Sequence, residues 1–233
     1  MPLIRVPQHT PEDLAAWERL EREDAAWAAR PRLGELAAAA LDLLADFRPD
    51  YVSCSWGKDS LVLAHLAWTL GELGGHRAPL VWVRVRDREN PWCPAVRDAY
   101  LAAHSCEYHE IEADAEDAVT ADGRRALTSG AGFREAARRF GPRRATGLRG
   151  DESGGRRRRM EQGLVLGDSC APLGHWTARD VYAYLYRERL PVHPAYAMSH
   201  GGRLDRDRLR VASLGGDRGR GMGRAEWERR YYR

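Results

Sequence analysis

The first stretch of the chain has apolar residues at helical spacing. They recur every three or four positions from residue 10 to residue 47, with a break at Pro31, and Thr10 stands where a helix N-cap is expected. This pattern predicts two amphipathic helices. We assign residues 1–47 to an N-terminal helical extension that leads into the first strand, and we attach no chemistry to it.

From residue 48 onward, short β-prone runs alternate with helical stretches. The runs lie at residues 51–52, 78–85, 106–111 and 143–148, with helical patterns between them. Such alternation builds βαβ units and therefore a parallel sheet. We predict an α/β fold, a three-layer open and mostly parallel sheet with helices on both faces, over residues 48–200.

Three later stretches complete the prediction. Residues 112–130 lack strong periodicity and predict a loop or insertion, of a composition that suits a lid. Residues 176–186 predict a helix capped by Thr177, followed by an extended segment at 190–196. Residues 201–233 are rich in Gly and Arg and poor in apolar groups, so we expect a segment that packs on the domain or trails from it.

The turn after the first predicted strand has the residues of a phosphate loop. Residues 55–60 read Ser-Trp-Gly-Lys-Asp-Ser and open a helix. Small residues let a phosphate approach the backbone, helix-opening N–H groups point at the anion, and Lys58 adds positive charge. The spacing of the Walker loop is absent. Taken alone, the hexapeptide also fits an ordinary strand-to-helix turn.

A second polar segment follows the strand predicted at 143–148. Residues 147–153 read Gly-Leu-Arg-Gly-Asp-Glu-Ser and precede four consecutive arginines, residues 156–159. Ligands of open α/β sheets bind at the carboxyl ends of strands, so we expect this segment and residues 55–60 to lie at the same edge. The individual side chains of residues 157–159 fit a solvated basic face.

Both segments resemble signatures of a known family. Residues 55–60 resemble the S-G-G-K-D-S loop of the adenine nucleotide α-hydrolase superfamily, with Trp56 in place of the first Gly. Residues 147–156 resemble the G-x-R-x-x-E-S-x-x-R pattern of its PAPS reductase family, which includes the small subunit of ATP sulfurylase. Residues 171–182 and 190–196 are similar to that family's P-[LI]-x-x-W-[ST]-x-x-D-[VI] and L-P-x-x-P-x-Y stretches, which are mostly architectural.

The resemblance implies an adenine nucleotide α-hydrolase-like fold of HUP type and roles for individual residues. Lys58, Asp59 and Arg149 are the catalytic candidates, and Asp151 and Glu152 are the candidate ligands of Mg²⁺. The nucleotide- and phosphate-binding candidates are Ser53, Ser55, Gly57, Lys58, Asp59, Ser60, Gly147, Arg149 and Arg156.

The implied activity is that of an ATP pyrophosphatase. ATP is cleaved between its α and β phosphates, with Mg²⁺, to adenylylate an acceptor in sulfur metabolism or thio-modification. The family's reductases carry a C-terminal E-C-G-[IL]-H motif, but no cysteine follows Cys170 here. Sulfonucleotide reduction is therefore not favoured, and we expect no iron–sulfur cluster, since the cysteine pairs that hold one in the APS-reducing branch are missing.

Two alternatives stay open. One is a reductase-like enzyme that binds PAPS, because arginine-rich late loops suit a 3′-phosphate. The other is a nucleic-acid-acting component of a DNA sulfur-modification or phage-defence system, in which arginines of residues 203–233 hold backbone phosphate.

Composition narrows the remaining possibilities. The formal charge of +3 is too small to demand a nucleic-acid partner, and Lys58 is the single lysine among 37 basic residues. Four scattered cysteines without a C-x-x-C pair argue against a zinc ribbon and a disulfide scaffold. With no charged-then-apolar leader and no run of 18 apolar residues, we expect a cytoplasmic protein that binds an adenine nucleotide and no membrane. The acceptor, a partner subunit and a homo-oligomer are left open.

Overall fold

The centre of the fold is a six-stranded sheet. The computed structural model describes residues 1–86, 90–119, 125–198, 205–209 and 211. The strand order is β3-β2-β1-β6-β8-β7, and only the β7–β8 pair is antiparallel. The strands are β1 (Tyr51–Ser53), β2 (Leu80–Val85), β3 (Tyr108–Ala113), β6 (Arg144–Ala145), β7 (Val165–Leu166) and β8 (Ser169–Cys170). The predicted mostly parallel α/β sheet is confirmed.

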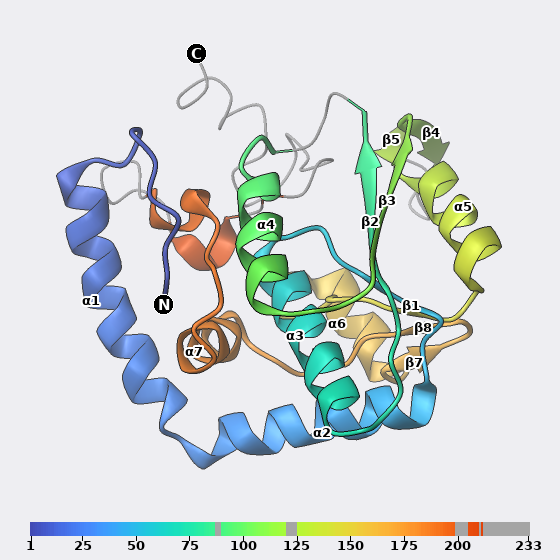
Figure 1. Cartoon of the computed structure of the whole chain (residues 1–233), viewed down its shortest axis with the longest axis horizontal. Helices are drawn as coiled ribbons and strands as arrows, with labels where there is room; N and C mark the ends of the chain where they lie inside the picture. The colour runs from blue at the N-terminus through green and yellow to red at the C-terminus, as the bar shows by residue number, and fades with distance from the viewer. Residues whose placement is uncertain (87–89, 120–124, 199–204, 210, 212–233) are drawn as a thin grey trace.

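Helices cover both faces of this sheet. α3 (Lys58–Glu72) and α4 (Cys93–Ala103) lie on one side of β2 and β3, and α5 (Gly130–Phe140) lies on the other (Figure 1). Along β2, Leu80 and Trp82 join the larger hydrophobic cluster, whereas Val81 and Val83 join a smaller one with Ala136 of α5. Successive strand side chains point to opposite faces, so β2 is buried on both sides.

The N-terminal helices pack into the same core. α1 (Pro11–Ala28) and α2 (Pro31–Phe47) meet at a sharp angle at the lower left of Figure 1, and the break falls at the predicted proline. α1 packs on α7 (Ala178–Arg187), and α2 packs on α3. Trp17 and Leu44 are both buried in the larger hydrophobic cluster. The predicted helical pattern over residues 10–47 is therefore confirmed.

The segment 112–130 differs from its prediction. We predicted a loop or an insertion, and the structure has an antiparallel pair of strands, β4 (Glu116–Val119) and β5 (Arg125–Thr128), so the loop prediction is wrong. The two strands have four residues each and few β-branched or aromatic residues, so they leave little strand signal in the sequence. The lid role stays a prediction.

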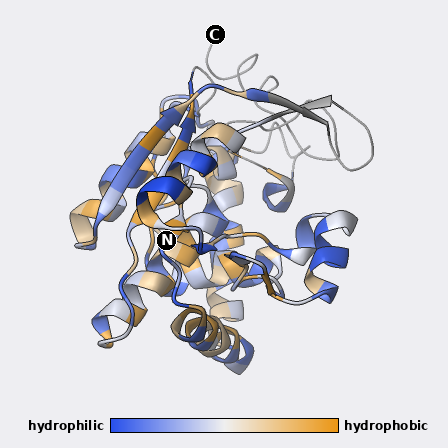
Figure 2. Cartoon of the chain, turned by 90° about the vertical axis from the view of Figure 1, so that its right-hand side faces the viewer, coloured by the Kyte–Doolittle hydropathy of each residue, from blue (hydrophilic) through white to orange (hydrophobic). Residues whose placement is uncertain are grey.

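None of the described helices is long and apolar enough to span a membrane. Hydrophobic and hydrophilic residues alternate along them in Figure 2. Their apolar residues form faces that pack against the sheet and against each other.

α7 starts at a capping box that also ties it to α1. The Thr177 hydroxyl accepts from the Asp180 N–H at 3.2 Å, and the Asp180 carboxylate accepts from the Thr177 N–H at 2.8 Å. The indole N–H of Trp27 donates to the same carboxylate at 2.9 Å. The predicted N-cap is confirmed, and the fully buried Asp180 carboxylate links two helices.

We predict that Thr177→Ala lowers the free energy of unfolding by about 1 to 2 kcal/mol, because it removes the acceptor of one helix-opening N–H group. Urea titration followed by circular dichroism measures the change. Thr177→Ser, which keeps the hydroxyl, is the control and retains most of the stability. An alanine variant as stable as the wild type would contradict this account of the cap.

Candidate functional site

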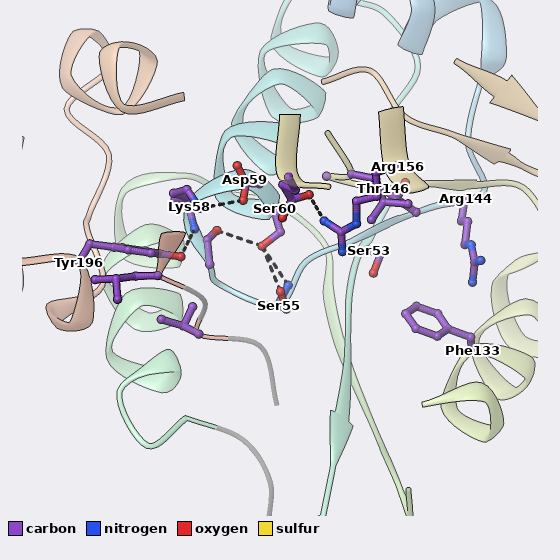
Figure 3. Close-up of a pocket in the computed structure, with 16 residues that line it drawn as sticks. Ser53, Ser55, Lys58, Asp59, Ser60, Phe133, Arg144, Thr146, Arg156 and Tyr196 are labelled. Atoms are coloured by element: carbon purple, nitrogen blue, oxygen red, sulfur yellow. Dashed lines mark hydrogen bonds and ion pairs between the residues drawn. The ribbon is translucent and has the colours of Figure 1, made fainter. Parts of the chain in front are cut away.

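A pocket of about 470 Å³ opens where β1 and β6 end (Figure 3). β1 pairs with β2 on one side and with β6 on the other, so the pocket lies where the strand order reverses, the usual ligand position in open α/β sheets. Its walls come from the loop after β1, the segment after β6, α5 and two later segments. The lining residues are Ser53, Ser55, Gly57, Lys58, Asp59, Ser60, Phe133, Arg144, Thr146, Gly147, Leu148, Glu152, Arg156, Tyr196, Leu209 and Val211.

The two predicted signatures therefore meet at one pocket. Of the residues that the sequence predicts for the site, all line this pocket except Arg149 and Asp151. The parallel strands explain the convergence, since both segments follow the carboxyl end of a strand.

Trp56 occupies the loop position where the resembling family has Gly. It adopts a φ of 61°, in the left-handed region that disfavours residues with a Cβ. The side chain is fully buried, and its ring centroid lies 5.7 Å from that of Tyr100 and 5.5 Å from that of Tyr108. Burial of the indole between these rings offsets the backbone cost, and the side chain leaves the pocket open.

The loop is held in shape by its own hydroxyl groups and by a later tyrosine. The Ser60 hydroxyl accepts from the Ser55 N–H at 3.1 Å and donates to the Gly57 carbonyl at 3.1 Å. The Lys58 N–H donates to the hydroxyl of Tyr196 at 3.1 Å (Figure 3). The Ser60 hydroxyl therefore stabilises the loop, in addition to its place on the pocket wall.

Gly147 lets the second segment approach the start of α3. A Cβ on this residue would lie 2.9 Å from the backbone nitrogen of Ser60 and 3.0 Å from the carbonyl carbon of Asp59. Neither backbone atom can move without displacing the helix end. A side chain at residue 147 would therefore disturb the loop that the first segment forms.

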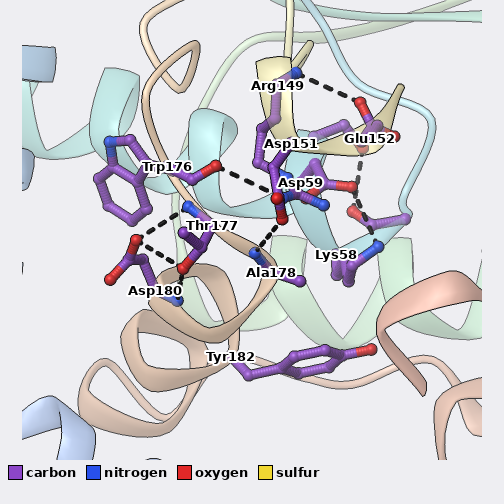
Figure 4. Close-up of polar contacts among 12 residues, drawn as sticks. Lys58, Asp59, Arg149, Asp151, Glu152, Trp176, Thr177, Ala178, Asp180 and Tyr182 are labelled. Carbon is purple, nitrogen blue, oxygen red and sulfur yellow. Dashed lines mark hydrogen bonds and ion pairs between the residues drawn. The ribbon is translucent and has the colours of Figure 1, made fainter. Parts of the chain in front are cut away.

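Three charged side chains, Lys58, Asp59 and Arg149, form two consecutive ion pairs at the centre of the site (Figure 4). The Lys58 ammonium lies 3.2 Å from Asp59 Oδ2, and Arg149 Nε donates to Asp59 Oδ1 at 2.6 Å. Burial lowers the pKa of Lys58, and Asp59 offsets part of that shift. Burial raises the pKa of Asp59, but Lys58 and Arg149 outweigh it and hold this pKa below its ordinary value. Asp59 is therefore ionised at neutral pH.

Arg149 lies behind Asp59 and outside the pocket. Its side chain is 1% exposed, and Nη1 donates to Asp151 Oδ2 at 3.2 Å and to the Trp176 carbonyl at 3.5 Å. The Ala178 N–H also donates to Asp151, at 3.1 Å. This arrangement differs from the phosphate contact that we predicted for Arg149. The guanidinium instead joins the start of α3 to the start of α7.

The two predicted metal ligands are engaged by neighbouring groups. Asp151 belongs to η1 (Gly150–Glu152) and accepts from the Arg149 guanidinium. The Glu152 carboxylate accepts from the Arg149 backbone N–H at 3.2 Å. Glu152 also pairs with Arg156, in α6 (Gly154–Glu161). Within the described residues, no three His, Cys, Asp or Glu side chains converge as a metal site. Binding of Mg²⁺ by Asp151 and Glu152 stays a prediction.

Several lining residues were missed by the sequence analysis. Tyr196 is in η2 (Pro194–Ala197), inside a stretch expected to be extended and architectural. Arg144 places its guanidinium 4.8 Å from the Phe133 ring centroid at one end of the pocket. Leu209 follows η3 (Arg206–Arg208), within residues 201–233, where we predicted no site residue. Among these residues, Tyr196 alone belongs to a sequence pattern that could have identified it, the L-P-x-x-P-x-Y stretch.

The four cysteines, and the histidines among the described residues, do not line the pocket. His65 bonds the Tyr184 hydroxyl at 3.0 Å, and burial lowers the pKa of His65 to about 4. All four cysteines are in described parts of the chain, and none lines the pocket. Burial raises the pKa of Cys54 and of Cys170 to about 12. These two thiols are therefore protonated at neutral pH.

We predict that Trp56→Gly lowers the free energy of unfolding by about 1 to 4 kcal/mol. Removing the left-handed strain gains about 1 to 2 kcal/mol, but losing a buried indole costs about 3 to 5 kcal/mol. Denaturant titration measures the balance, with Trp56→Phe as the variant that keeps a buried ring. A more stable glycine variant would show that strain, and not packing, dominates at this position.

We predict that Arg149→Met lowers the free energy of unfolding by about 3 to 5 kcal/mol, because it breaks the buried ion pairs with Asp59 and Asp151 and leaves Lys58 as the remaining partner of Asp59. Arg156→Met is the matched control, since Arg156 lines the pocket with a partly exposed side chain, and its loss changes stability by about 1 kcal/mol or less. Equal effects of the two variants in the same urea titration would argue against the positioning role of Arg149.

No protein-family model and no curated protein matches the chain. Among solved structures, the U34-tRNA thiolase NcsA from Methanococcus maripaludis with its [4Fe-4S] cluster matches at 16% identity and a TM-score of 0.49, over 73% of this chain and 70% of that one. We expected no iron–sulfur cluster, but NcsA carries one. The expectation is therefore corrected, and an iron–sulfur cluster is no longer excluded.

Proposed function

We propose that the chain binds ATP in this pocket and cleaves it between the α and β phosphates to adenylylate an acceptor. The observation that carries the proposal is the position of Lys58. Its buried ammonium lies on the pocket wall, at the N-terminus of a 15-residue helix and at the reversal of strand order. Each of these three features favours a bound anion.

The start of α3 supplies donors for the phosphates. The first N–H groups of a helix have no intrahelical acceptor, and the helix dipole adds positive potential there. The Tyr196 hydroxyl accepts from the Lys58 N–H. The N–H groups of the next two residues, Asp59 and Ser60, would then donate to phosphate oxygens. Ser55 adds a hydroxyl on the same wall.

The charged side chains that line the pocket favour an anionic ligand. Three of them are basic, Lys58, Arg144 and Arg156, and two are acidic, Asp59 and Glu152. Arg149 lies behind Asp59 and offsets its charge from the side away from the pocket. The Lys58 ammonium therefore keeps its attraction for the phosphates despite the adjacent carboxylate.

The proposed reaction needs little covalent participation by the protein. A nucleophilic atom of the acceptor attacks the α-phosphorus, the bond to the oxygen that bridges α and β breaks, and pyrophosphate leaves with the electron pair. A nucleobase acceptor releases its ring N–H proton to water, whereas sulfate has no proton to release. Positioning and stabilisation of the phosphate charge supply the catalysis, through Lys58 and the start of α3. Sulfate and a nucleobase to be thiolated are candidate acceptors.

The second candidate is a PAPS-binding enzyme. Arg144 and Arg156 line the pocket, and two guanidinium groups suit a further phosphate or sulfate group. A thiol-based reduction is less well supported, since Cys54 and Cys170 are buried thiols outside the pocket. The nucleic-acid alternative depends on arginines that fall mostly outside the described residues, and it stays a prediction.

We predict that ATP at a hundredfold excess over its Kd stabilises the wild type by about 2.7 kcal/mol and that Lys58→Met removes most of this effect. Asp59 keeps Arg149 as a partner in the variant, so the fold is retained. Thermal shifts with ATP, AMP and PAPS, each with and without Mg²⁺, measure the preference. Arg77→Met, at an exposed ion pair with Glu72, is the control.

Turnover is tested with ATP labelled in the α-phosphate and with candidate acceptors. Release of pyrophosphate that depends on an acceptor and on Lys58 supports the proposal. Stabilisation by PAPS alone favours the second candidate. Failure of every nucleotide to stabilise the wild type would refute nucleotide binding at this pocket.

A further inference from the structure

We propose that Arg206 is a positioning residue for the pocket. Through its ion pair with Asp24, it fixes residues 205–209 and 211, which we call the anchored segment, against the phosphate loop. The effect on ligand binding rests on the proposed ATP function, whereas the anchoring itself does not.

The anchor is a buried bidentate ion pair. Arg206 Nη1 donates to Asp24 Oδ2 at 2.8 Å, and Nη2 donates to Asp24 Oδ1 at 2.5 Å. Arg206 is 8% exposed and Asp24, in α1, is 1% exposed. The fork geometry fixes the direction of the guanidinium as well as its distance.

A second element holds the same residue. The guanidinium lies 4.0 Å from the ring centroid of Tyr182 in α7, and the Tyr182 hydroxyl donates to the Arg206 carbonyl at 3.0 Å. Both the side chain and the backbone of Arg206 are thus fixed by the α1–α7 pair. Desolvation offsets much of the attraction in a buried ion pair, so such a pair contributes specific geometry more than stability.

The other end of the anchored segment forms part of the pocket wall. Leu209 and Val211 are buried and line the pocket. A Cβ on Gly57 would lie 3.1 Å from Val211 Cγ2, so Val211 is in close contact with the phosphate loop. Cys93 Sγ in α4 lies 4.0 Å from the Val211 carbonyl. The segment therefore connects the α1–α7 pair to the loop and contacts Cys93.

The same segment acts on the charge of the site. Burial lowers the pKa of Lys58, and the carboxylates that raise it again are Asp59 and Asp207 of the anchored segment. Release of the segment removes an apolar wall from the neighbourhood of Lys58, and this loss outweighs the removal of the Asp207 carboxylate, which by itself would favour an anion. Water then reaches the phosphate loop, and its contacts with a ligand weaken.

The test compares the wild type with Arg206→Met and with the control Arg77→Met, which loses an exposed ion pair elsewhere. The first readout is the alkylation rate of Cys93 without nucleotide, followed by peptide mass spectrometry. Cys93 is 2% exposed, and the partly exposed Cys106 is the internal reference. We expect Cys93 to react about tenfold faster or more in Arg206→Met, while Cys106 is unchanged, because opening of the segment becomes more frequent.

The second readout is the Kd for ATP, measured by calorimetry on variants whose circular dichroism and melting transition show a folded protein. We expect the Kd to rise about tenfold in Arg206→Met and to stay at the wild-type value in Arg77→Met. Where Arg206→Met does not fold, Asp24→Asn, which keeps an acceptor oxygen for the guanidinium, provides the same comparison.

The two readouts separate the possible failures. Protection of Cys93 in a folded Arg206→Met variant would overturn the anchoring. A reactive Cys93 with an unchanged Kd would overturn the positioning role in the pocket. If the wild type does not bind ATP, the proposed function fails, and the alkylation of Cys93 still decides whether Arg206 anchors the segment.

Discussion

The ion pair between Asp59 and Arg149 holds the two halves of the pocket together. These residues are 90 positions apart, one in the first turn of α3 and the other after β6. A buried guanidinium requires partners for its N–H groups. Asp59, Asp151 and the Trp176 carbonyl provide them. The phosphate loop, the segment after β6 and the start of α7 therefore depend on one another for their positions.

An arginine suits this position better than a lysine. Its planar group serves three acceptors that lie in different directions, and it stays charged when buried. The site needs that permanent charge, because Asp59 is adjacent to the only lysine of the chain. With Arg149 as partner, Asp59 stabilises the loop without cancelling the charge of Lys58. The structural ion pair and the charge of the proposed phosphate site are thus two consequences of one arrangement.

Local sequence was sufficient for the elements that depend on periodicity and on strand ends. It placed the helices before residue 47, the strand–helix alternation and the two segments that meet at the pocket. It was insufficient where a role depends on distant partners. Arg149 is buried because α3 and α7 enclose it, and Leu209 belongs to the pocket because Asp24 fixes its neighbour Arg206. The short strands β4 and β5 gave too weak a pattern to be recognised.

The phosphate loop is fixed from three sides by contacts within the protein. Trp56 is packed between Tyr100 and Tyr108, the Lys58 N–H is bonded to Tyr196, and Val211 lies against Gly57. A loop that is already ordered loses less conformational entropy on binding than a flexible one. Its dipoles also need no reorientation when charge develops on a phosphate. A tryptophan in place of the usual glycine therefore suits a preorganised anion site, because the ring fixes the backbone that glycine would leave free.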